Sequence, residues 1–217
     1  MKLYYDPITV NCRKVLAGLD LVGAPYESSN VDYFGGGHKE AAYLEINPNG
    51  ELPALTEDDL VLWESNAILV YGAEKVGNTT AYPKDPKIRA DIQRWLLWES
   101  SKWFAACYVY LVENVVKPML DATPDNAVLE GAAPTFHQLA GILEKRLEGR
   151  DWLSADNPTI ADIAVAAPMH LHAFQKLPLE NYPNLRAWMT RVEALPCWQK
   201  SDPAPHIAPE LIAKLVA

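Results

Sequence analysis

A carboxylate, a hydroxyl and a predicted helix start come together at Glu64 and Ser65. The apolar pattern that follows predicts a helix over residues 66–75, with Ser65 as its N-cap. A helix N-terminus offers unpaired N–H groups and partial positive charge, and both attract a carboxylate. The acidic side chain of Glu64 attracts an ammonium group. This pair therefore predicts a site for a small molecule that carries both charges.

A short apolar strand that begins at Leu52 and Pro53 supplies a second kind of binding surface. The preceding residues Pro48, Asn49 and Gly50 are typical of a turn. Proline cannot donate a hydrogen bond to a sheet, so Pro53 belongs at an edge or a strand entry. If the Leu52–Pro53 peptide bond is cis, Leu52 turns its N–H and C=O outward, where an extended peptide can pair with them. The expected ligand is thus extended and peptide-like, with an ammonium and a carboxylate close together.

The elements that hold these residues follow the order strand, helix, strand, helix, strand, strand, helix. The predicted strands cover 2–5, 26–31, 52–56 and 60–63, and the predicted helices cover 12–21, 38–44 and 66–75. The first strand-helix-strand unit is expected to be right-handed. This is the order of a thioredoxin-like α/β domain.

The composition changes at 77–86, which is rich in glycine, proline and small polar residues and is typical of a linker. Beyond it the pattern favours helices alone. They are predicted at 87–117, 127–147, 163–174, 184–195 and 209–216, and Thr159 and Asp162 form a capping-box pattern before the third. We therefore expect a thioredoxin-like domain over 1–76, a linker over 77–86 and an all-α domain over 87–217.

Charge and composition exclude several classes of function. With 217 residues and a formal net charge of −9, the chain lacks the basic surface that nucleic-acid binding needs. No stretch is apolar enough to cross a membrane, and the N-terminus does not resemble a signal peptide, so a cytoplasmic protein is expected. Three scattered cysteines indicate reduced thiols. His170 and His172 point to different faces of a helix, so no metal site is predicted.

The motifs together resemble those of the cytosolic glutathione S-transferases, over almost the full chain. They are Asn47-Pro48-Asn49-Gly50, Leu52-Pro53-Ala54-Leu55, Glu64-Ser65-Asn66-Ala67-Ile68 and Thr159-Ile160-Ala161-Asp162, followed by Pro183-Asn184 with Trp188 and Arg191. The loop after the first strand is similar to that of bacterial members of a serine, theta-like or nu-like class. The resemblance implies a homodimer with its active site in the crevice between the two domains, and glutathione as co-substrate.

The resemblance also implies roles for six residues in holding glutathione. The backbone of Leu52 would pair with the cysteinyl unit, beside Pro53 as the cis-proline. Glu64 and Ser65 would hold the γ-glutamyl ammonium and carboxylate. The glycyl carboxylate would be reached by His38 and Lys39.

The residue that activates the thiol lies, by the same resemblance, in the loop after the first strand. Thr9 occupies the position of the serine in the serine classes, and Thr9, Asn11 and Lys14 match the nu-like pattern. A donor aimed at sulfur favours the thiolate, which is the nucleophile. Thr9 is favoured over Asn11 by a small margin. Cys12 is an alternative redox nucleophile, but a small buried apolar role is the better interpretation for it.

The electrophile would enter an apolar crevice. Trp103, Cys107 and Tyr110 follow helical i, i+4, i+7 spacing and could line it, although such aromatic clusters more often form a core or a dimer interface. The leading hypothesis is a transferase that adds the glutathione thiolate to an apolar electrophile. The alternatives are glutathione-dependent disulfide reduction of the nu-like type and a non-catalytic protein-interaction module.

Overall fold

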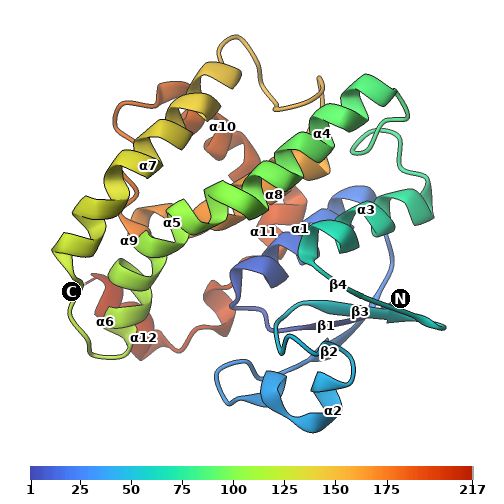
Figure 1. The fold of residues 1–217 in the computed structure, drawn as a ribbon, viewed down its shortest axis with the longest axis horizontal. Coiled ribbons are helices and arrows are strands. Elements are labelled where there is room, and N and C mark those ends of the chain that lie inside the picture. The colour runs from blue at the N-terminus through green and yellow to red at the C-terminus, as the bar shows by residue number, and fades with distance from the viewer. Residues whose placement is uncertain (217) are drawn as a thin grey trace.

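A four-stranded sheet organises the N-terminal part of the chain (Figure 1). In this computed structural model, which describes residues 1–216, the strand order is β2-β1-β3-β4. The strands are β1 (Lys2–Tyr5), β2 (Glu27–Asn30), β3 (Ala54–Glu57) and β4 (Leu60–Trp63). β1 is parallel to β2 and antiparallel to β3, which in turn is antiparallel to β4. With its helices this gives the thioredoxin-like α/β domain that the sequence predicts.

Helices α1 (Val10–Val22) and α3 (Ser65–Val76) cover one face of the sheet, and α2 (Ala41–Leu44) lies at the other (Figure 1). The two covering helices approach each other closely at Gly18. A β-carbon there would lie 2.1 Å from Leu69 Cδ2, so the contact depends on glycine. The predicted helix over 38–44 is divided into a 3₁₀ turn (Gly37–Lys39) and α2, with extended backbone at Glu40.

One long helical segment begins the C-terminal domain, after a connection over 77–85. It comprises α4 (Pro86–Trp98), a π-helical turn (Glu99–Trp103), α5 (Phe104–Leu111), a second π-helical turn (Val112–Val116) and α6 (Lys117–Met119). The sequence predicts this segment as a single helix over 87–117. The π-helical turns each widen the helix by one residue, and such turns are frequent at functional sites.

The remaining helices form an all-α domain around this segment (Figure 1). They are α7 (Asn126–Arg146), α8 (Ile160–Ala166), α9 (His172–Gln175), α10 (Pro183–Glu193), α11 (Pro196–Lys200) and α12 (Pro209–Val216), with 3₁₀ turns at Ala167–Met169 and Ala204–His206. The prediction of a single helix over 163–174 is wrong. Pro168 supplies no N–H, so α8 ends before it and the chain continues in a 3₁₀ turn. Pro134, in contrast, is accommodated inside α7.

Helix α1 joins the two domains. Arg13 on its buried face donates from Nη1 to the carbonyl oxygen of His170 at 3.0 Å, and its guanidinium lies 4.3 Å from the centroid of the Trp198 ring. Burial lowers the pKa of Arg13 to about 10. The start of α1 therefore lies between the sheet and the helical domain and contacts both.

Among residues 1–216, no helix combines the length and the apolar character that a membrane span requires.

Candidate functional site

The loop between β1 and α1 is organised by a buried carboxylate that sequence reasoning missed. Asp6 is 5% exposed, and its side chain accepts hydrogen bonds from Ile8 N at 2.9 Å and Tyr33 N at 3.1 Å. It thereby ties the start of α1 to the segment after β2. No motif marks Asp6, because its partners are backbone groups, one of them 27 residues away.

Thr9 and Asn11 lie where this loop enters α1. Thr9 is the N-cap residue in extended conformation, and its hydroxyl donates to the carbonyl oxygen of Asp6 at 3.2 Å. Asn11 is half-buried, and its Oδ1 is covered without a hydrogen-bond partner among the described residues. A hydroxyl, an amide and the N-terminus of a 13-residue helix therefore converge here. This combination suits an anion such as a thiolate.

Cys12 packs inward. Its side chain is fully buried and accepts a hydrogen bond from Asp6 N at 3.4 Å. Burial raises the pKa of Cys12 to about 12, so the thiol stays protonated at neutral pH. The interpretation of Cys12 as a small apolar residue agrees with this environment, and redox attack by its thiolate does not.

The entry of β3 is held from both sides. The carbonyl oxygen of Glu51 accepts from Tyr43 Oη at 2.6 Å and Asn47 Nδ2 at 2.8 Å. The Leu52–Pro53 peptide bond is cis, as predicted. The ladder with β1 begins at Ala54, so Leu52 lies outside it, at the strand entry.

Glu64 and Ser65 lie at the start of α3, but not in the roles that capping statistics predict. Glu64 is the N-cap residue, with a positive φ of 73°, and is exposed to solvent. Ser65 is instead the first helical residue, so its predicted N-cap role is wrong. Its hydroxyl accepts from Lys14 Nζ at 3.1 Å rather than bonding to the helix backbone. A positive φ is costly for glutamate, and such strain is concentrated at functional sites.

A buried ion pair lies behind Ser65. Lys14 on α1 donates to Glu99 Oε2 at 2.9 Å, with both side chains almost fully buried. Burial lowers the pKa of Lys14, and the charge of Glu99 partly opposes that effect. Lys14 Nζ lies within hydrogen-bond distance of both Glu99 Oε2 and Ser65 Oγ, which is the geometry of an ammonium donor with two acceptors. Glu99 belongs to the first π-helical turn, so the helical domain reaches the start of α3 through this pair.

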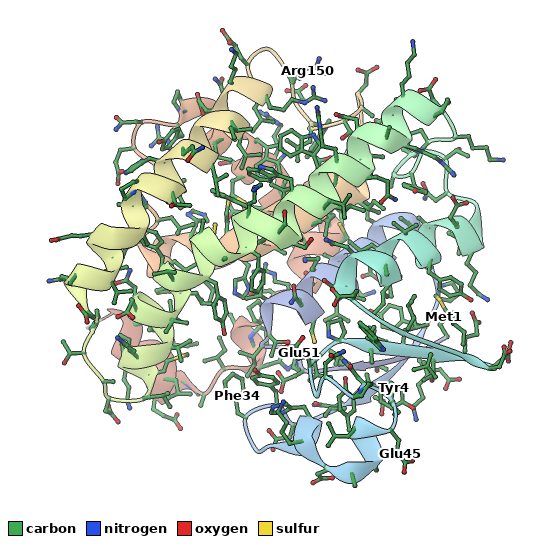
Figure 2. All side chains as sticks on the ribbon, in the orientation of Figure 1. Met1, Tyr4, Phe34, Glu45, Glu51 and Arg150 are labelled. Carbon is green, nitrogen blue, oxygen red and sulfur yellow. The ribbon has the colours of Figure 1, made fainter. Side chains whose placement is uncertain are left out.

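His38 and Lys39 lie on the opposite side of the β3 entry. Lys39 Nζ donates to the carbonyl oxygen of Gly50 at 2.8 Å, beside the turn that precedes Leu52. The His38 ring stacks on Tyr33 with centroids 4.2 Å apart. Figure 2 shows Glu51 and Phe34 at the same end of the sheet, away from Met1. This end is therefore where the predicted site residues of the sheet domain gather.

The predicted lining of the electrophile crevice needs correction. Trp103 and Cys107 are fully buried and Tyr110 is 5% exposed, and the Trp103 indole donates to the carbonyl oxygen of Val165. These three side chains form the core of the helical domain, because their spacing marks one apolar face and that face turns inward. A side chain without exposed surface offers no contact to an incoming molecule.

Another face of α5 carries the aromatic residues that solvent reaches. Phe104 and Tyr108 are stacked with centroids 5.2 Å apart, and Tyr108 is 41% exposed. Burial, and to a smaller extent the nearby Tyr33, raise the pKa of Tyr108. Lys14 Nζ lies 6.0 Å from the centroid of the Phe104 ring. Phe34, next to Tyr33, is 69% exposed. Phe104 of the helical domain therefore lies beside Lys14, and Tyr33 of the sheet domain lies near Tyr108.

Within the described part of the chain, no group of three or more histidine, cysteine or acidic side chains is arranged to hold a metal ion. His170, one of the two histidines considered, is enclosed, and burial lowers its pKa to about 3.

Comparison with known proteins gives consistent matches over both domains. A family model described as "Glutathione S-transferase, N-terminal domain" matches residues 10–75, and one described as "Glutathione S-transferase, C-terminal domain" matches residues 109–196. A probable glutathione S-transferase GSTF2 of Oryza sativa subsp. japonica is 34% identical over 203 residues, which are 92% of this chain and 94% of the relative. Glutathione S-transferase 3 of Zea mays is 31% identical and covers 96% of each chain.

Among solved structures, a theta class glutathione S-transferase of Xanthomonas axonopodis pv. citri with glutathione bound is similar at a TM-score of 0.80. It is 29% identical, with 93% of this chain and 96% of that chain covered. Both curated relatives are plant proteins, so they give no support to the expected bacterial class.

Proposed function

The chain belongs to the glutathione S-transferase family, and we propose that it transfers the thiolate of glutathione to a small apolar electrophile. The observation that carries the proposal is the arrangement at one end of the sheet. Leu52 lies outside the ladder at the entry of β3, and Ser65 opens α3 directly after β4. An extended tripeptide with charged ends matches that arrangement.

The proposed pose of glutathione uses six residues. The backbone of Leu52, beside Pro53, pairs with the cysteinyl unit. The γ-glutamyl carboxylate binds Ser65 and the N-terminus of α3, and the γ-glutamyl ammonium binds Glu64. The glycyl carboxylate lies towards His38 and Lys39, which supply positive charge and N–H donors.

The chemistry requires the thiol to lose its proton. A free thiol with a pKa near 8.5 is mostly protonated at neutral pH. Thr9, and Asn11 to a smaller extent, are proposed to donate to the sulfur at the N-terminus of α1, where the helix adds partial positive charge. The proton leaves to solvent, and the thiolate then attacks the electrophile and displaces its leaving group or adds to it.

We place the electrophile against Phe104 and Tyr108 of α5, with Tyr33 and Phe34 on the opposite wall. This replaces the lining that sequence reasoning suggested. Exposed aromatic rings from the two domains favour an apolar or planar acceptor, because rings of this kind stack on one another with centroids about 4.5–7 Å apart.

A homodimer is part of the proposal. β4 is an edge strand, and Val61 and Trp63 on it are 48% and 40% exposed. A groove of about 550 Å³ with a mainly apolar lining runs between α5 and α7 and includes Trp98 and Ile142. The open sheet edge with its exposed apolar side chains and the separate apolar groove both suit burial against a second copy of the chain.

We also propose a cytoplasmic location. Cys12, Cys107 and Cys197 are unpaired and buried, as expected for reduced thiols of an intracellular protein.

The test starts with retention on immobilised glutathione and with thermal protection by free glutathione. Conjugation to an aryl halide and reduction of a glutathione mixed disulfide are then measured side by side. Glutathione binding with faster conjugation than reduction is the expected result. A chain that neither binds glutathione nor is protected by it would refute the enzyme proposal, and faster disulfide reduction would replace conjugation with the reductase activity.

A further inference from the structure

The buried ion pair of Lys14 and Glu99 makes further hydrogen bonds to the first residues of α3. Lys14 also contacts Ser65, and the same carboxylate oxygen that accepts from Lys14 accepts from Asn66 Nδ2 at 3.0 Å. Asn66 Nδ2 donates in addition to the carbonyl oxygen of Leu96 at 2.8 Å. The first two residues of α3 are thus bound to the end of α4 and the π-helical turn through one polar cluster.

The direction of the bond between Lys14 and Ser65 is fixed by chemistry. A lysine ammonium is a donor only, so the Ser65 hydroxyl must be the acceptor in this bond. Its own proton therefore cannot point at Lys14. Lys14 lies on the buried side, with its side chain 2% exposed, whereas Ser65 retains a small exposed fraction of 8% at the start of α3. The hydroxyl proton is therefore free to point to the exposed side of Ser65, where a ligand can reach it.

We propose that Lys14 is a positioning residue that turns the proton of Ser65 towards the γ-glutamyl carboxylate of glutathione, with Glu99 holding Lys14 in place. This rests on the proposed function, because it concerns one end of the same ligand. Lys14 touches neither the ligand nor the reacting sulfur in this scheme. It acts by hydrogen-bond direction rather than by net charge, since Glu99 compensates the charge of Lys14 at 2.9 Å.

Further contacts support this role over simple packing. Glu99 Oε1 and Asn66 Oδ1 are both buried without a hydrogen-bond partner among the described residues. Burying a charged pair with incomplete hydrogen bonding costs stability, and an apolar pair of similar volume is often as stable or more so. The arrangement is therefore poorly explained by stability. Orientation of a ligand-binding hydroxyl explains why a charge is kept beneath Ser65.

The test is a cycle of substitutions that keeps the interior free of unpaired charge. Ser65→Ala is introduced into the wild-type chain and into Lys14→Met/Glu99→Leu, and glutathione affinity is measured by calorimetry. A hydrogen bond to a charged group contributes enough for Ser65→Ala to weaken binding about tenfold or more in the wild type. In the Lys14→Met/Glu99→Leu background we expect less than about a threefold effect, because the hydroxyl is no longer directed.

A second probe identifies the group on the ligand. γ-Aminobutyryl-cysteinyl-glycine lacks the γ-glutamyl carboxylate and keeps the rest of the backbone. The wild-type chain should prefer glutathione over this analogue, and the preference should fall in Ser65→Ala and in Lys14→Met/Glu99→Leu by similar factors. In both variants KM for glutathione should rise, whereas kcat should change by less than about threefold, because the thiol is activated by other residues.

Controls separate this role from a general loss of structure. Lys117→Met/Glu113→Leu removes another ion pair of the same long helical segment, with N–O distance 2.6 Å, and should leave the effect of Ser65→Ala unchanged. If Lys14→Met/Glu99→Leu does not melt cooperatively, Lys14→Met/Glu99→Gln replaces it and keeps a partner for Asn66. An equal cost of Ser65→Ala in both backgrounds overturns the inference while glutathione binding stands. Absence of glutathione binding in the wild type overturns the proposed function instead.

Discussion

The hydroxyl of Thr9 donates a hydrogen bond to the carbonyl oxygen of Asp6, 3.2 Å away. The same proton is the one proposed to stabilise the glutathione thiolate. A hydroxyl has a single proton, so the bond to Asp6 must be exchanged for a bond to sulfur when the ligand arrives. A hydrogen bond to an anion is stronger than one to a neutral carbonyl, which favours that exchange. Without ligand, the Thr9 hydroxyl therefore donates to Asp6 within the loop, and it turns to the glutathione sulfur only when glutathione binds.

Replacement of Thr9 tests this exchange. Thr9→Val keeps the shape and removes the donor, and we expect kcat/KM to fall roughly 10–100-fold because the pKa of bound glutathione rises by about one to two units. Ultraviolet absorbance of the thiolate, titrated in the bound complex, measures that pKa. Thr9→Ser is the matched control and should keep most of the activity. Wild-type rates in Thr9→Val would assign the donor to Asn11 or to a backbone N–H.

The parts of this site that lie close together in sequence were the ones that could be predicted. The cis bond of Leu52 and Pro53 and the beginning of a helix near Ser65 depend on neighbouring residues, although the N-cap itself lies one residue earlier than predicted, at Glu64. The element order and the two-domain division follow from periodicity in the same way. The partner of Ser65 could not be predicted, because Lys14 lies 51 positions earlier and is brought to it only by the packing of α1 on α3.

The residues that line the electrophile crevice could not be predicted from the sequence, for a different reason. Helical spacing correctly groups Trp103, Cys107 and Tyr110 on one face of the segment formed by the first π-helical turn and α5. Spacing does not say what covers a face, and here the other helices cover it. Phe104 and Tyr108 belong to a face with equally aromatic composition, so sequence alone offered no means of choosing between them.

Removal of the Tyr108 ring tests the revised lining. We expect Tyr108→Ala to raise KM for a planar aromatic electrophile about three- to tenfold, because one stacked aromatic pair contributes about 0.5–1.5 kcal/mol beyond its buried area. KM for glutathione should stay within about twofold. Tyr108→Phe keeps the ring and serves as the control. An unchanged KM for the electrophile in Tyr108→Ala would place the acceptor elsewhere.

A charge on the edge strand tests the proposed dimer. Trp63 on β4 is 40% exposed, so Trp63→Glu should leave the fold of a single chain intact while placing an unpaired charge in the interface. Size-exclusion chromatography with light scattering should show a dimer for the wild type and a shift to monomer for the variant. Phe34→Glu, at an exposed aromatic position outside the proposed interface, should remain dimeric.

The capping interaction of α8 provides a prediction about stability alone. Asp162 is fully buried and accepts from Thr159 N, Thr159 Oγ1, Leu153 N and Trp188 Nε1. Asp162→Ala leaves these donors without a partner, so we expect a loss of about 3–5 kcal/mol in the free energy of unfolding. Denaturant titration measures it. Asp151→Ala, at an exposed acidic position, should change the free energy of unfolding by less than about 0.5 kcal/mol.

Because His170 is buried, we expect the chain to lose stability in mild acid. Burial holds its pKa at about 3 in the folded chain, against a reference value of 6.5. The unfolded chain therefore binds a proton below pH 6.5 that the folded chain does not, and the free energy of unfolding decreases as the pH falls from 6.5 towards 3. The slope from this group approaches about 1.4 kcal/mol per pH unit once the unfolded histidine is protonated.

The neighbouring Arg13 makes this effect larger, because its guanidinium donates to the carbonyl oxygen of His170 and opposes a second positive charge there. Denaturant titrations between pH 7 and pH 5 should show the slope in the wild type, before most carboxylates titrate. His170→Phe should remove it, whereas His172→Gln, at a half-buried position paired with Glu193, should keep it. Equal slopes in the wild type and in His170→Phe would show that His170 does not control stability in this pH range.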